Sequence, residues 1–405
     1  MQRGSFQWMK SLNKSIILNK IRTNGPISRA QIAKETELTP PTVGSIVKEL
    51  LEQQLIKESQ LGESQGGRKP TMLILHQEAY HIIGVDVGPV DIQFIISNLT
   101  GEITAELKIK INNQLDNQAF LDMLTDGIHQ LMNNQSSLRY IGIGVAMHGI
   151  VDAETGTSLF APNLYLRNIP IKEHLEQHFD MEVKVENDAK AFALGEAWFN
   201  EDMVHKSMLA VNIGRGIGAG LVNDGKLFNG ADGIAGEIGH MMIERNGRKC
   251  SCGNDGCLQT IASGPAIALI AKEKLESGQK SILQEWTNEL SNEITAEMVY
   301  KAAKMNDKLS NEVFQEVGES LGIAFTNIIH TFNPAHIIIG GGVARAGELL
   351  LNPIRKTIAS RAISDRAKRT PVILSNLDAY GSSYGAVALI LSDIFQPSLS
   401  EHIKK

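Results

Sequence analysis

The stretch SRAQIAKETELTPPTVGSIVKELLEQQLI, residues 28–56, decides the fold of the first part of this chain. Its apolar residues recur at helical spacing in two blocks, with a break near Glu37. Ser28 is a preferred N-cap residue for the first block, and Thr39 followed by Pro40 is a preferred start for the second. We therefore expect two consecutive helices joined by a short turn.

A helix is also expected before residue 24, with one apolar face formed by Leu12, Ile16, Ile17 and Ile21. In the last of the three helices, which starts at Pro40, short polar side chains lie opposite the apolar positions and near the helix start. A recognition helix presents such groups to base edges in the major groove of DNA. The pattern favours a helix-turn-helix, and the alternative is a small three-helix core of another module.

Two short strands, residues 55–58 and 72–75, are expected on either side of the polar stretch QLGESQGGRKPT, residues 60–71. This arrangement is typical of a winged helix-turn-helix in which residues 62–70 form the wing, or a joint that re-aims the head. Flexible glycines before two cations suit a narrow minor groove, and the alternative is a solvated linker. The residues predicted to contact DNA are Ser28, Arg29, Thr39, Pro40, Thr42, Ser45, Lys48, Arg68 and Lys69.

The charge is divided unevenly along the chain. Residues 1–80 carry 11 Lys and Arg against 7 Asp and Glu, a net charge of +4, whereas residues 81–405 carry 28 against 38, a net charge of −10. A basic head on an acidic body suits contact with DNA phosphates through the head alone. No apolar run is long enough to span a bilayer and the N-terminus has no hydrophobic signal region, so we expect no membrane partner and a cytoplasmic location.

The three cysteines of the chain, Cys250, Cys252 and Cys257, lie close together. Disulfides are rare in the cytosol, and an odd number leaves one thiol unpaired. Three neighbouring thiolates suit a tetrahedral zinc site completed by one further ligand, and His240 is the best candidate upstream. We predict a closed, structural zinc site, and the alternative is three reduced thiols in a tight turn.

Two segments of the body share one pattern of strand, glycine turn and strand: VDVGPVDIQFIIS, residues 85–97, and VNIGRGIGAGLVN, residues 211–223. Such duplication indicates two related α/β lobes with a cleft between them. We expect a DNA-binding domain and linker over residues 1–80, a first lobe over residues 81–200, and a second lobe over residues 201–405. The second lobe would carry the zinc site and a dimerisation surface.

Four motifs carry a resemblance to a known family: IGIGVAMHGIVD (141–152), VENDAKAFALGE (185–196), AGEIGH with the cysteines and CLQTIASG (235–264), and IIIGGGVARAGELLLNPIR (337–355). Over nearly its whole length the chain resembles the ROK family of sugar kinases and repressors. The winged head and SQGGRKP are most similar to its xylose-repressor branch, with NagC and Mlc as more distant relatives. The resemblance implies a two-lobed actin-like (ribonuclease-H-like) sugar-kinase fold, with the last motif on the adenosine side.

The resemblance also implies a sugar site formed by Gly149, Asn163, Asn187, Asp188, Glu237, His240 and Gln259. Carboxylates and amides on rigid strand ends suit a ring of hydroxyl groups, and His240 would place one ring nitrogen on zinc and the other on a hydroxyl. Plainer alternatives are a turn for Asn163, a helix cap for Asn187 and Asp188, and a solvated loop for Glu237. The family often has Glu at position 259, so Gln259 puts the usual sugar specificity in question.

Asp188 matches the general base of the family's kinases, but both phosphate loops depart from the family pattern. In the first loop, Pro89 removes a backbone N–H and Val90 replaces a threonine. In the second, Arg215 stands in place of a threonine. A loop that holds phosphate through converging N–H groups is weakened by such changes. We therefore expect no residue to act catalytically and no sugar kinase activity.

The sequence predicts a sugar-responsive, DNA-binding repressor of carbohydrate-utilisation genes, with xylose as the first candidate effector. A homodimer or tetramer would place recognition helices on a double-stranded, near-palindromic operator. The alternatives are an ATP-dependent sugar kinase that also binds DNA, and an adaptor controlled by a protein partner.

Overall fold

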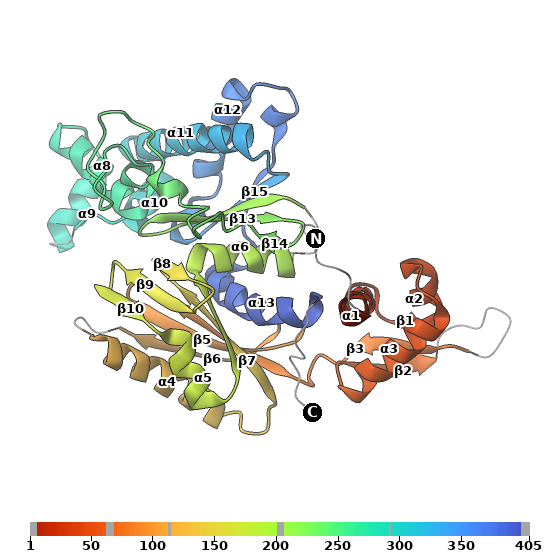
Figure 1. Cartoon of the computed structure of the whole chain (residues 1–405). Helices are drawn as coiled ribbons and strands as arrows, with labels where there is room; N and C mark the ends of the chain where they lie inside the picture. Colours follow the sequence, from red (N-terminus) through yellow and green to blue (C-terminus); the bar gives the residue numbers. More distant parts are fainter. Residues whose placement is uncertain (1–5, 62–68, 112–114, 201–205, 291–292, 398–405) are drawn as a thin grey trace. The chain divides into compact units, whose positions relative to one another are not determined.

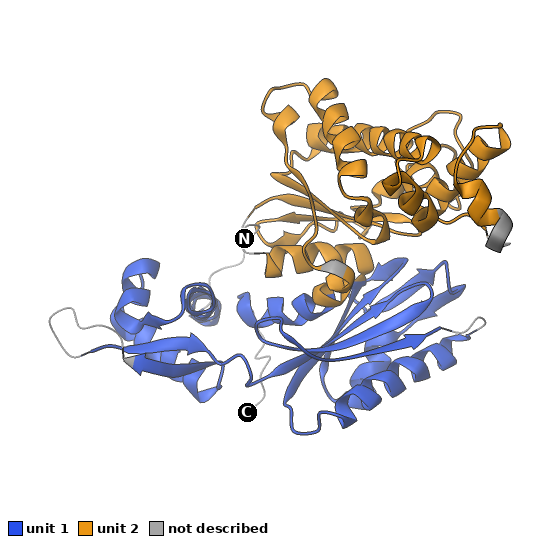
Figure 2. Ribbon diagram, turned by 180° about the vertical axis from the view of Figure 1, so that it is seen from behind, with its two compact units in different colours: residues 1–186, 386–405 blue, residues 187–385 orange. Residues whose placement is uncertain are grey.

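The computed structural model describes residues 6–61, 69–111, 115–200, 206–290 and 293–397 (Figure 1). The chain forms two compact units (Figure 2): unit 1 comprises residues 1–186 and 386–405, and unit 2 comprises residues 187–385. The lobe boundary predicted at residue 200 therefore lies inside unit 2, and the C-terminal segment belongs with unit 1. Within the described ranges, every helix is too short or too polar to cross a membrane.

Unit 1 begins with three helices and a small sheet, which we call the winged head. Its elements are α1 (Phe6–Asn24), β1 (Ile27–Ser28), α2 (Arg29–Thr36), α3 (Pro40–Glu52), β2 (Ile56–Leu61) and β3 (Thr71–Leu75), with sheet order β1-β3-β2. The predicted caps are confirmed, because Ser28 Oγ accepts from the Gln31 N–H at 3.2 Å and Thr39 Oγ1 accepts from the Thr42 N–H at 3.4 Å. Local capping chemistry thus sets where α2 and α3 begin.

The buried face of α1 differs from the predicted one. Ile17 and Ile21 are buried as expected, but Ile16 is exposed and Leu18 is fully buried. Helix α1 has apolar residues on two sides, so either side could be the one that is buried. Contacts with α2, α3 and β3 select the stripe that contains Leu18.

Residues 62–70 connect two strands of the winged head. Strands β2 and β3 pair antiparallel, with Ile56 opposite Leu75. The segment therefore connects two neighbouring strands of one sheet, and residues 62–68 lie outside the described part of the chain. The prediction that it is a joint between head and body is wrong, because both of its ends lie in the head. Residues 76–80 make that connection instead.

The rest of unit 1 is an α/β lobe built on a five-stranded sheet of order β11-β7-β4-β5-β6. Its elements are β4 (His81–Val87), β5 (Asp91–Asn98), β6 (Ile103–Lys110), α4 (Asn117–Asn133), β7 (Tyr140–Met147), β8 (Ile150–Asp152), β9 (Thr157–Ala161), β10 (Leu166–Ile169), α5 (Ile171–Phe179) and β11 (Glu182–Asn187). Strand β4 pairs antiparallel with β5 and parallel with β7. Helix α4 packs on β5 and β6 and contacts α5 (Figure 1).

Unit 2 repeats this arrangement with a sheet of order β14-β13-β12-β15-β16. Its strands are β12 (Met208–Ile213), β13 (Ile217–Asn223), β14 (Lys226–Leu227), β15 (His336–Gly340) and β16 (Val372–Leu374). Its helices are α6 (Asp188–Phe199), α7 (Gln259–Ala262), α8 (Gly264–Glu276), α9 (Leu283–Leu290), α10 (Ala296–Lys304), α11 (Lys308–Thr331) and α12 (Glu348–Arg361), with short 3₁₀ turns η2 (Ile238–His240), η3 (Gly342–Ala346), η4 (Ala367–Arg369) and η5 (Asp378–Tyr380). Helix α13 (Gly381–Phe395) starts in unit 2 and ends in unit 1.

In both sheets the first strand lies at the centre, antiparallel to the second strand and parallel to the fourth. The two segments of matching pattern are the first two strands of each sheet, so the predicted duplication is confirmed. The fully buried faces of β4 and β12 explain their near-continuous apolar runs.

Candidate DNA-binding head and effector site

Helix α3 has two distinct faces. Val43, Ile46, Val47 and Leu50 are buried in the core of the winged head. On the opposite side Ser45 is exposed, and the Lys48 side chain retains 79% of its accessible surface. A short hydroxyl and a cation on the free side of the second helix of a helix-turn-helix can reach base edges and phosphates. Ser45 and Lys48 are therefore both placed where they could contact DNA, as predicted.

Four other predicted DNA residues have side chains that already bond within the head. Ser28 is buried and caps α2, and Thr39 caps α3 while its hydroxyl lies 2.9 Å from that of Thr42. The Arg29 guanidinium pairs with Glu58 of β2 at 3.0 Å, which ties the start of α2 to the wing. These side chains already make hydrogen bonds or ion pairs within the head. Because Ser28 is also buried, it could contact DNA only through its backbone.

The wing contributes a described cation at Lys69, which is exposed immediately before β3. Pro40, at the first position of α3, is exposed as well. Arg68, the other predicted wing cation, lies outside the described residues.

Gly44 was missed by the sequence reasoning. It lies in the middle of α3 beside Ser45, and a Cβ at this position would meet no atom within 4 Å. Glycine in a helix interior costs about 1 kcal/mol relative to alanine, so packing does not explain it. The signal was present in the sequence, because the GS pair interrupts an otherwise strong helix.

We predict that Gly44→Ala stabilises the head but weakens its binding to DNA. The melting temperature of the head should rise, because the added methyl group has space and stabilises the helix by up to about 1 kcal/mol. Operator affinity should fall, because the methyl group stands on the flank of α3 that approaches the groove. Thermal unfolding and gel shift on the same protein measure both effects. Unchanged affinity would show that this flank stays clear of the DNA.

The three cysteines and His240 come together in unit 2, as predicted. Their ligand atoms all lie within 4.8 Å of one another. The Cys252 and Cys257 sulfurs are 3.7 Å apart, and the Cys250 sulfur is 3.6 Å from His240 Nδ1. The turn is shaped by two glycines with positive φ, at 95° for Gly253 and 69° for Gly256.

These distances fit a tetrahedral zinc ion. Zinc–sulfur bonds of about 2.3 Å place two sulfurs about 3.8 Å apart, and a sulfur and an imidazole nitrogen about 3.6 Å apart. The cysteines are too far apart for a disulfide, whose sulfurs lie at about 2.05 Å. The cluster has four protein ligands and no open position, which is the composition of a structural site.

The charges of the cluster also call for a cation. Burial raises the pKa of the Cys257 thiol to about 12, and the neighbouring Cys250 and Cys252 sulfurs add to the effect. For Cys250, burial acts in the same direction, but hydrogen bonds from Cys252, Gln259 and His240 outweigh it and lower the pKa to about 6. Three thiolates can coexist here only with a compensating positive charge.

Gln259 lies beside this cluster. Its Nε2 donates to the Cys250 sulfur at 3.1 Å and to Ser251 Oγ at 3.4 Å. An amide can donate to a thiolate, whereas the carboxylate often found here in the family cannot. The structure thus gives Gln259 a role next to the predicted metal ligands, and the sugar contact that the resemblance implies stays a prediction.

We predict that Gln259→Ala lowers zinc affinity by about 10-fold, because groups that hydrogen-bond metal ligands contribute about 10- to 100-fold to affinity. Competition with a chromophoric chelator measures the change. Ser251→Ala is the control, because Ser251 lies in the same loop and is no member of the cluster. Equal zinc affinity in Gln259→Ala and the wild type would exclude support of the metal by this amide.

Four predicted sugar residues surround the start of α6 in unit 2. Asn187 caps the helix, accepting from the N–H groups of Ala189 at 3.0 Å and Lys190 at 3.1 Å, so the capping alternative is confirmed. Asp188 occupies the first turn, and Nε2 of His240 lies 4.0 Å from the Glu237 carboxylate.

The His240 ring therefore faces the thiols with Nδ1 and Glu237 with Nε2. The predicted use of His240, with one ring nitrogen on zinc and the other on a sugar hydroxyl, stays a prediction, and this orientation of the ring is compatible with it. Burial raises the pKa of Glu237, Asp188 adds to the rise, and His240 and Lys190 oppose it. The carboxylate nevertheless keeps 43% of its side-chain surface exposed, so it remains accessible to a polar ligand.

Lys190 was also missed. It is 4% exposed, and its ammonium group donates to the Gly233 carbonyl. A buried lysine is rare unless it is paired, and here its charge acts against the rise in the pKa of Glu237. A lysine inside the apolar helix AKAFALGE was the available signal.

The remaining two predicted sugar residues belong to unit 1. Gly149 follows β7 with φ of 94°, and a Cβ there would lie 2.2 Å from the Phe160 carbonyl oxygen and 2.9 Å from Pro162. Gly149 therefore lies in a turn where the backbone of β9 approaches too closely for a side chain, and its place in a sugar site stays a prediction. Asn163 is exposed and directly follows Pro162. Because Pro162 is close to Gly149, Gly149 and Asn163 are near neighbours.

The first phosphate-type loop, between β4 and β5 of unit 1, forms a closed turn. The Gly88 N–H donates to the Asp91 carbonyl at 3.0 Å, and Pro89 has no N–H. Val90 is half exposed and offers no hydroxyl. The loop therefore offers no free N–H at positions 88 and 89 to converge on a phosphate.

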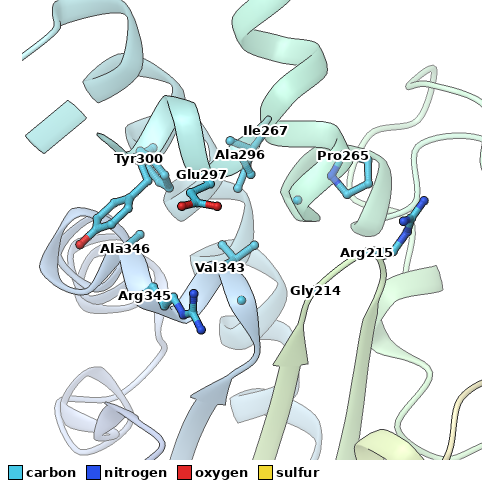
Figure 3. Close-up of a pocket in the computed structure, with 13 residues that line it drawn as sticks. Gly214, Arg215, Pro265, Ile267, Ala296, Glu297, Tyr300, Val343, Arg345 and Ala346 are labelled. Carbon is cyan, nitrogen blue, oxygen red and sulfur yellow. The ribbon is translucent and has the colours of Figure 1, made fainter. Parts of the chain in front are cut away.

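The second loop, between β12 and β13, lines a pocket of about 320 Å³ within unit 2 (Figure 3). Gly342, Val343, Arg345 and Ala346, from the segment predicted to lie on the adenosine side, line the same pocket. The Gly214 N–H is occupied by the Gly216 carbonyl at 2.9 Å, and the Gly264 N–H by the Gly214 carbonyl at 2.8 Å. The pocket is formed, but two of its backbone donors are used within the protein.

The winged head and the duplicated body define a DNA-binding regulator built on a sugar-kinase fold. The chain belongs to the ROK family, whose model matches residues 82–393, and a winged helix-turn-helix DNA-binding model matches residues 14–57.

The chain is similar to the xylose repressor of Caldicellulosiruptor bescii, with 34% identity over 96% of this chain and 98% of that protein. A crystal structure of a ROK family transcriptional regulator, described as a homolog of the E. coli Mlc protein, matches with a TM-score of 0.86 and 29% identity over 97% of this chain and 98% of that one. A ROK family glucokinase from Streptomyces griseus, in complex with glucose and AMPPNP, matches with a TM-score of 0.68 and 29% identity over 76% of this chain and 98% of its own.

Proposed function

We propose that this protein is a sugar-responsive transcriptional repressor of carbohydrate-utilisation genes, with xylose as the first candidate effector. One observation carries the proposal: a winged head with a free polar face on α3 is part of the same chain as a kinase-type body in which the Gly88 and Gly214 N–H groups of the phosphate loops are bonded within the protein. Similarity to a named xylose repressor over 96% of the chain supports it.

We further propose that the polar residues at the start of α6 and at the two ends of η2 bind sugar hydroxyls. These residues are Asn187, Asp188, Glu237 and His240. Two carboxylates and an imidazole next to one lysine suit a neutral ring of donors and acceptors. Gly149 and Asn163 of unit 1, and Gln259 of unit 2, stay predictions from the family resemblance.

The cysteine cluster is proposed to hold zinc as a structural metal, through His240, Cys250, Cys252 and Cys257. Zinc would fix the loop that carries Glu237 and the His240 ring, and would determine which ring nitrogen carries the proton. Its role is to hold that loop in shape, because the four protein ligands complete the coordination.

A homodimer is proposed as the DNA-binding form. Two winged heads related by a two-fold axis would read half-sites about 34–36 Å apart, or a multiple of that spacing. The effector can shift operator affinity only through its preference for one state of the protein, and a tenfold release requires about 1.4 kcal/mol of that preference.

The proposal is tested with the full-length protein. A duplex selected from a random library should be retained at nanomolar protein and released when xylose, glucose or N-acetylglucosamine is added. Isothermal titration with each sugar gives its affinity. Failure to select any duplex would end the repressor proposal, and selection without release by any sugar would favour an adaptor controlled by a protein partner.

We predict that Arg68→Ala weakens operator binding and lowers its salt dependence by about one unit of the log–log slope, because one phosphate contact is lost. Binding measured between low and moderate salt gives the slope. Lys57→Ala, which removes an exposed cation of β2, is the control. A slope that matches the wild type would exclude insertion of Arg68 among the phosphates.

The second candidate function is an ATP-dependent sugar kinase, and the formed pocket in unit 2 favours it. The protein, ATP and magnesium are incubated with a sugar panel, and sugar phosphate is measured. Turnover near the ordinary kinase range of about 1–100 per second would establish this activity. We expect none, because of the closed turn at Gly88 and the missing N–H of Pro89.

A further inference from the structure

The carboxyl end of α13 is held by the first helix of the winged head. Phe395 is fully buried, and its carbonyl accepts hydrogen bonds from Ser15 Oγ and, at 2.7 Å, from Asn19 Nδ2. The Arg22 guanidinium lies over the Phe395 ring, 5.4 Å from its centre. The last four carbonyls of a helix have no partner within it, so α1 satisfies the end of α13 from a distant part of the chain. A cation also suits the negative end of the helix dipole.

The beginning of α13 packs against α6 inside unit 2. A Cβ on Gly385 would lie 2.0 Å from the Ala191 carbonyl oxygen, and one on Gly195 would lie 2.9 Å from the Gly385 nitrogen. A Cβ on Gly381 would lie 2.6 Å from the Phe192 ring. The two helices therefore touch backbone to backbone. Helix α6 is also the helix whose first turn carries Asp188, one of the proposed sugar ligands.

The middle of α13 rests on the sheet of unit 1. A Cβ on Gly144 of β7 would lie 1.8 Å from the Ala386 carbonyl oxygen, and one on Gly142 would lie 3.0 Å from Ile390. The Lys184 ammonium group pairs with Asp393 at 2.5 Å. The beginning, the middle and the end of α13 thus each pack closely against a different element. Closely packed elements move together, so a shift at one end of α13 would be passed to the other end.

A second attachment of the winged head to the lobe of unit 1 gives a basis for comparison. The Tyr80 hydroxyl donates to the Gln53 carbonyl at 2.8 Å, and Arg139 donates to Gln54 at 2.6 Å while its guanidinium lies over the Tyr80 ring. This attachment lies next to the covalent connection and makes no use of α13.

We propose that α13 carries effector occupancy from α6 to the winged head, with Ser15 and Asn19 as positioning residues that couple α1 to its end. The inference rests on the proposed function, because it assumes a sugar on the side chains at the start of α6. A movement of α6 on sugar binding would shift α13 at the glycine contacts and would displace α1, and α1 packs on α3. The sugar site and the DNA-binding helix α3 would then be coupled through α13 and α1, and the wing would not be involved.

The test measures coupling. The full-length protein binds its selected operator with and without a saturating sugar, taken as the member of xylose, glucose and N-acetylglucosamine that raises the melting temperature. The ratio of the two operator dissociation constants is the coupling factor. By linkage, the operator must change the sugar affinity by the same factor, which gives an independent second measurement.

In Ser15→Ala/Asn19→Ala we expect the coupling factor to fall about fivefold or more, while sugar affinity without DNA stays within about twofold of the wild type. Tyr80→Phe is the matched control, because it removes one hydrogen bond of the other attachment and should leave the factor unchanged. Hydrogen exchange of residues 6–24 should respond to the sugar in the wild type and in Tyr80→Phe, and not in the double variant.

If the double variant does not fold, Phe395→Leu replaces it, because leucine keeps apolar volume and removes the ring under Arg22. A coupling factor equal to the wild type in whichever variant folds would overturn the inference while leaving the proposed function standing. A wild-type factor of one would instead contradict the proposed function itself. A loss of coupling in Tyr80→Phe alone would assign the role to the other attachment.

Discussion

Cys257→Ala is expected to abolish zinc binding and to lower the melting temperature of the protein by roughly 10 °C or more. Cys257 is fully buried, and its sulfur lies 3.7 Å from that of Cys252. Removing one of four ligands opens the coordination shell and leaves two neighbouring thiolates without full compensation. Structural zinc contributes its binding free energy to folding, so the loss is far larger than that of one buried side chain.

The measurements are metal content by mass spectrometry and thermal unfolding with and without a strong chelator. Wild-type protein should contain one zinc per chain and should be destabilised by the chelator, whereas the variant should be indifferent to it. Ser251→Ala, in the same loop, should behave as the wild type. Purified wild-type protein that holds no metal and ignores the chelator would falsify the zinc proposal.

Ser45→Glu should reduce specific operator binding by about 100-fold or more. Ser45 is exposed on α3, opposite the buried Val43 and Ile46. A carboxylate there would meet the phosphates and base acceptors of the groove, and such like-charge contact costs several kcal/mol. Because the position is exposed, the head should stay folded.

Gel shift at fixed salt measures the loss of affinity, and thermal unfolding verifies that the head is intact. Gln7→Glu is the matched control, since it adds the same charge at an exposed position of α1. Operator binding by Ser45→Glu at wild-type strength would place the DNA on another face of the winged head.

The site predictions that held are those that depend on local chemistry. The capping of α2 by Ser28 and of α3 by Thr39 follows from short side chains and nearby N–H groups. The grouping of His240 with the three cysteines could be predicted because their spacing and residue types suit one metal. Gly44 and Lys190 were missed because each looks unremarkable until its open space or its burial is known.

Gln259 shows what a residue-by-residue transfer from the family leaves open. Its position in the motif implies a sugar contact, which stays a prediction, and the structure adds that its amide donates to the Cys250 sulfur. The direction in which a side chain points depends on its neighbours in the folded protein. A motif therefore gives the position of a residue in the sequence, but not the group that the residue contacts.

The sequence alone determined the three helices of the head, the duplicated strand pairs and the cysteine–histidine set, because periodicity, caps and spacing act over a few residues. Only the tertiary structure decided that β2 pairs with β3, so that residues 62–70 are not a joint to the body, that α1 turns Leu18 inward, and that α13 returns to unit 1. The hydrogen bond from Ser15 to Phe395 joins residues 380 positions apart. No local pattern encodes such a pair, because it exists only when the whole chain packs.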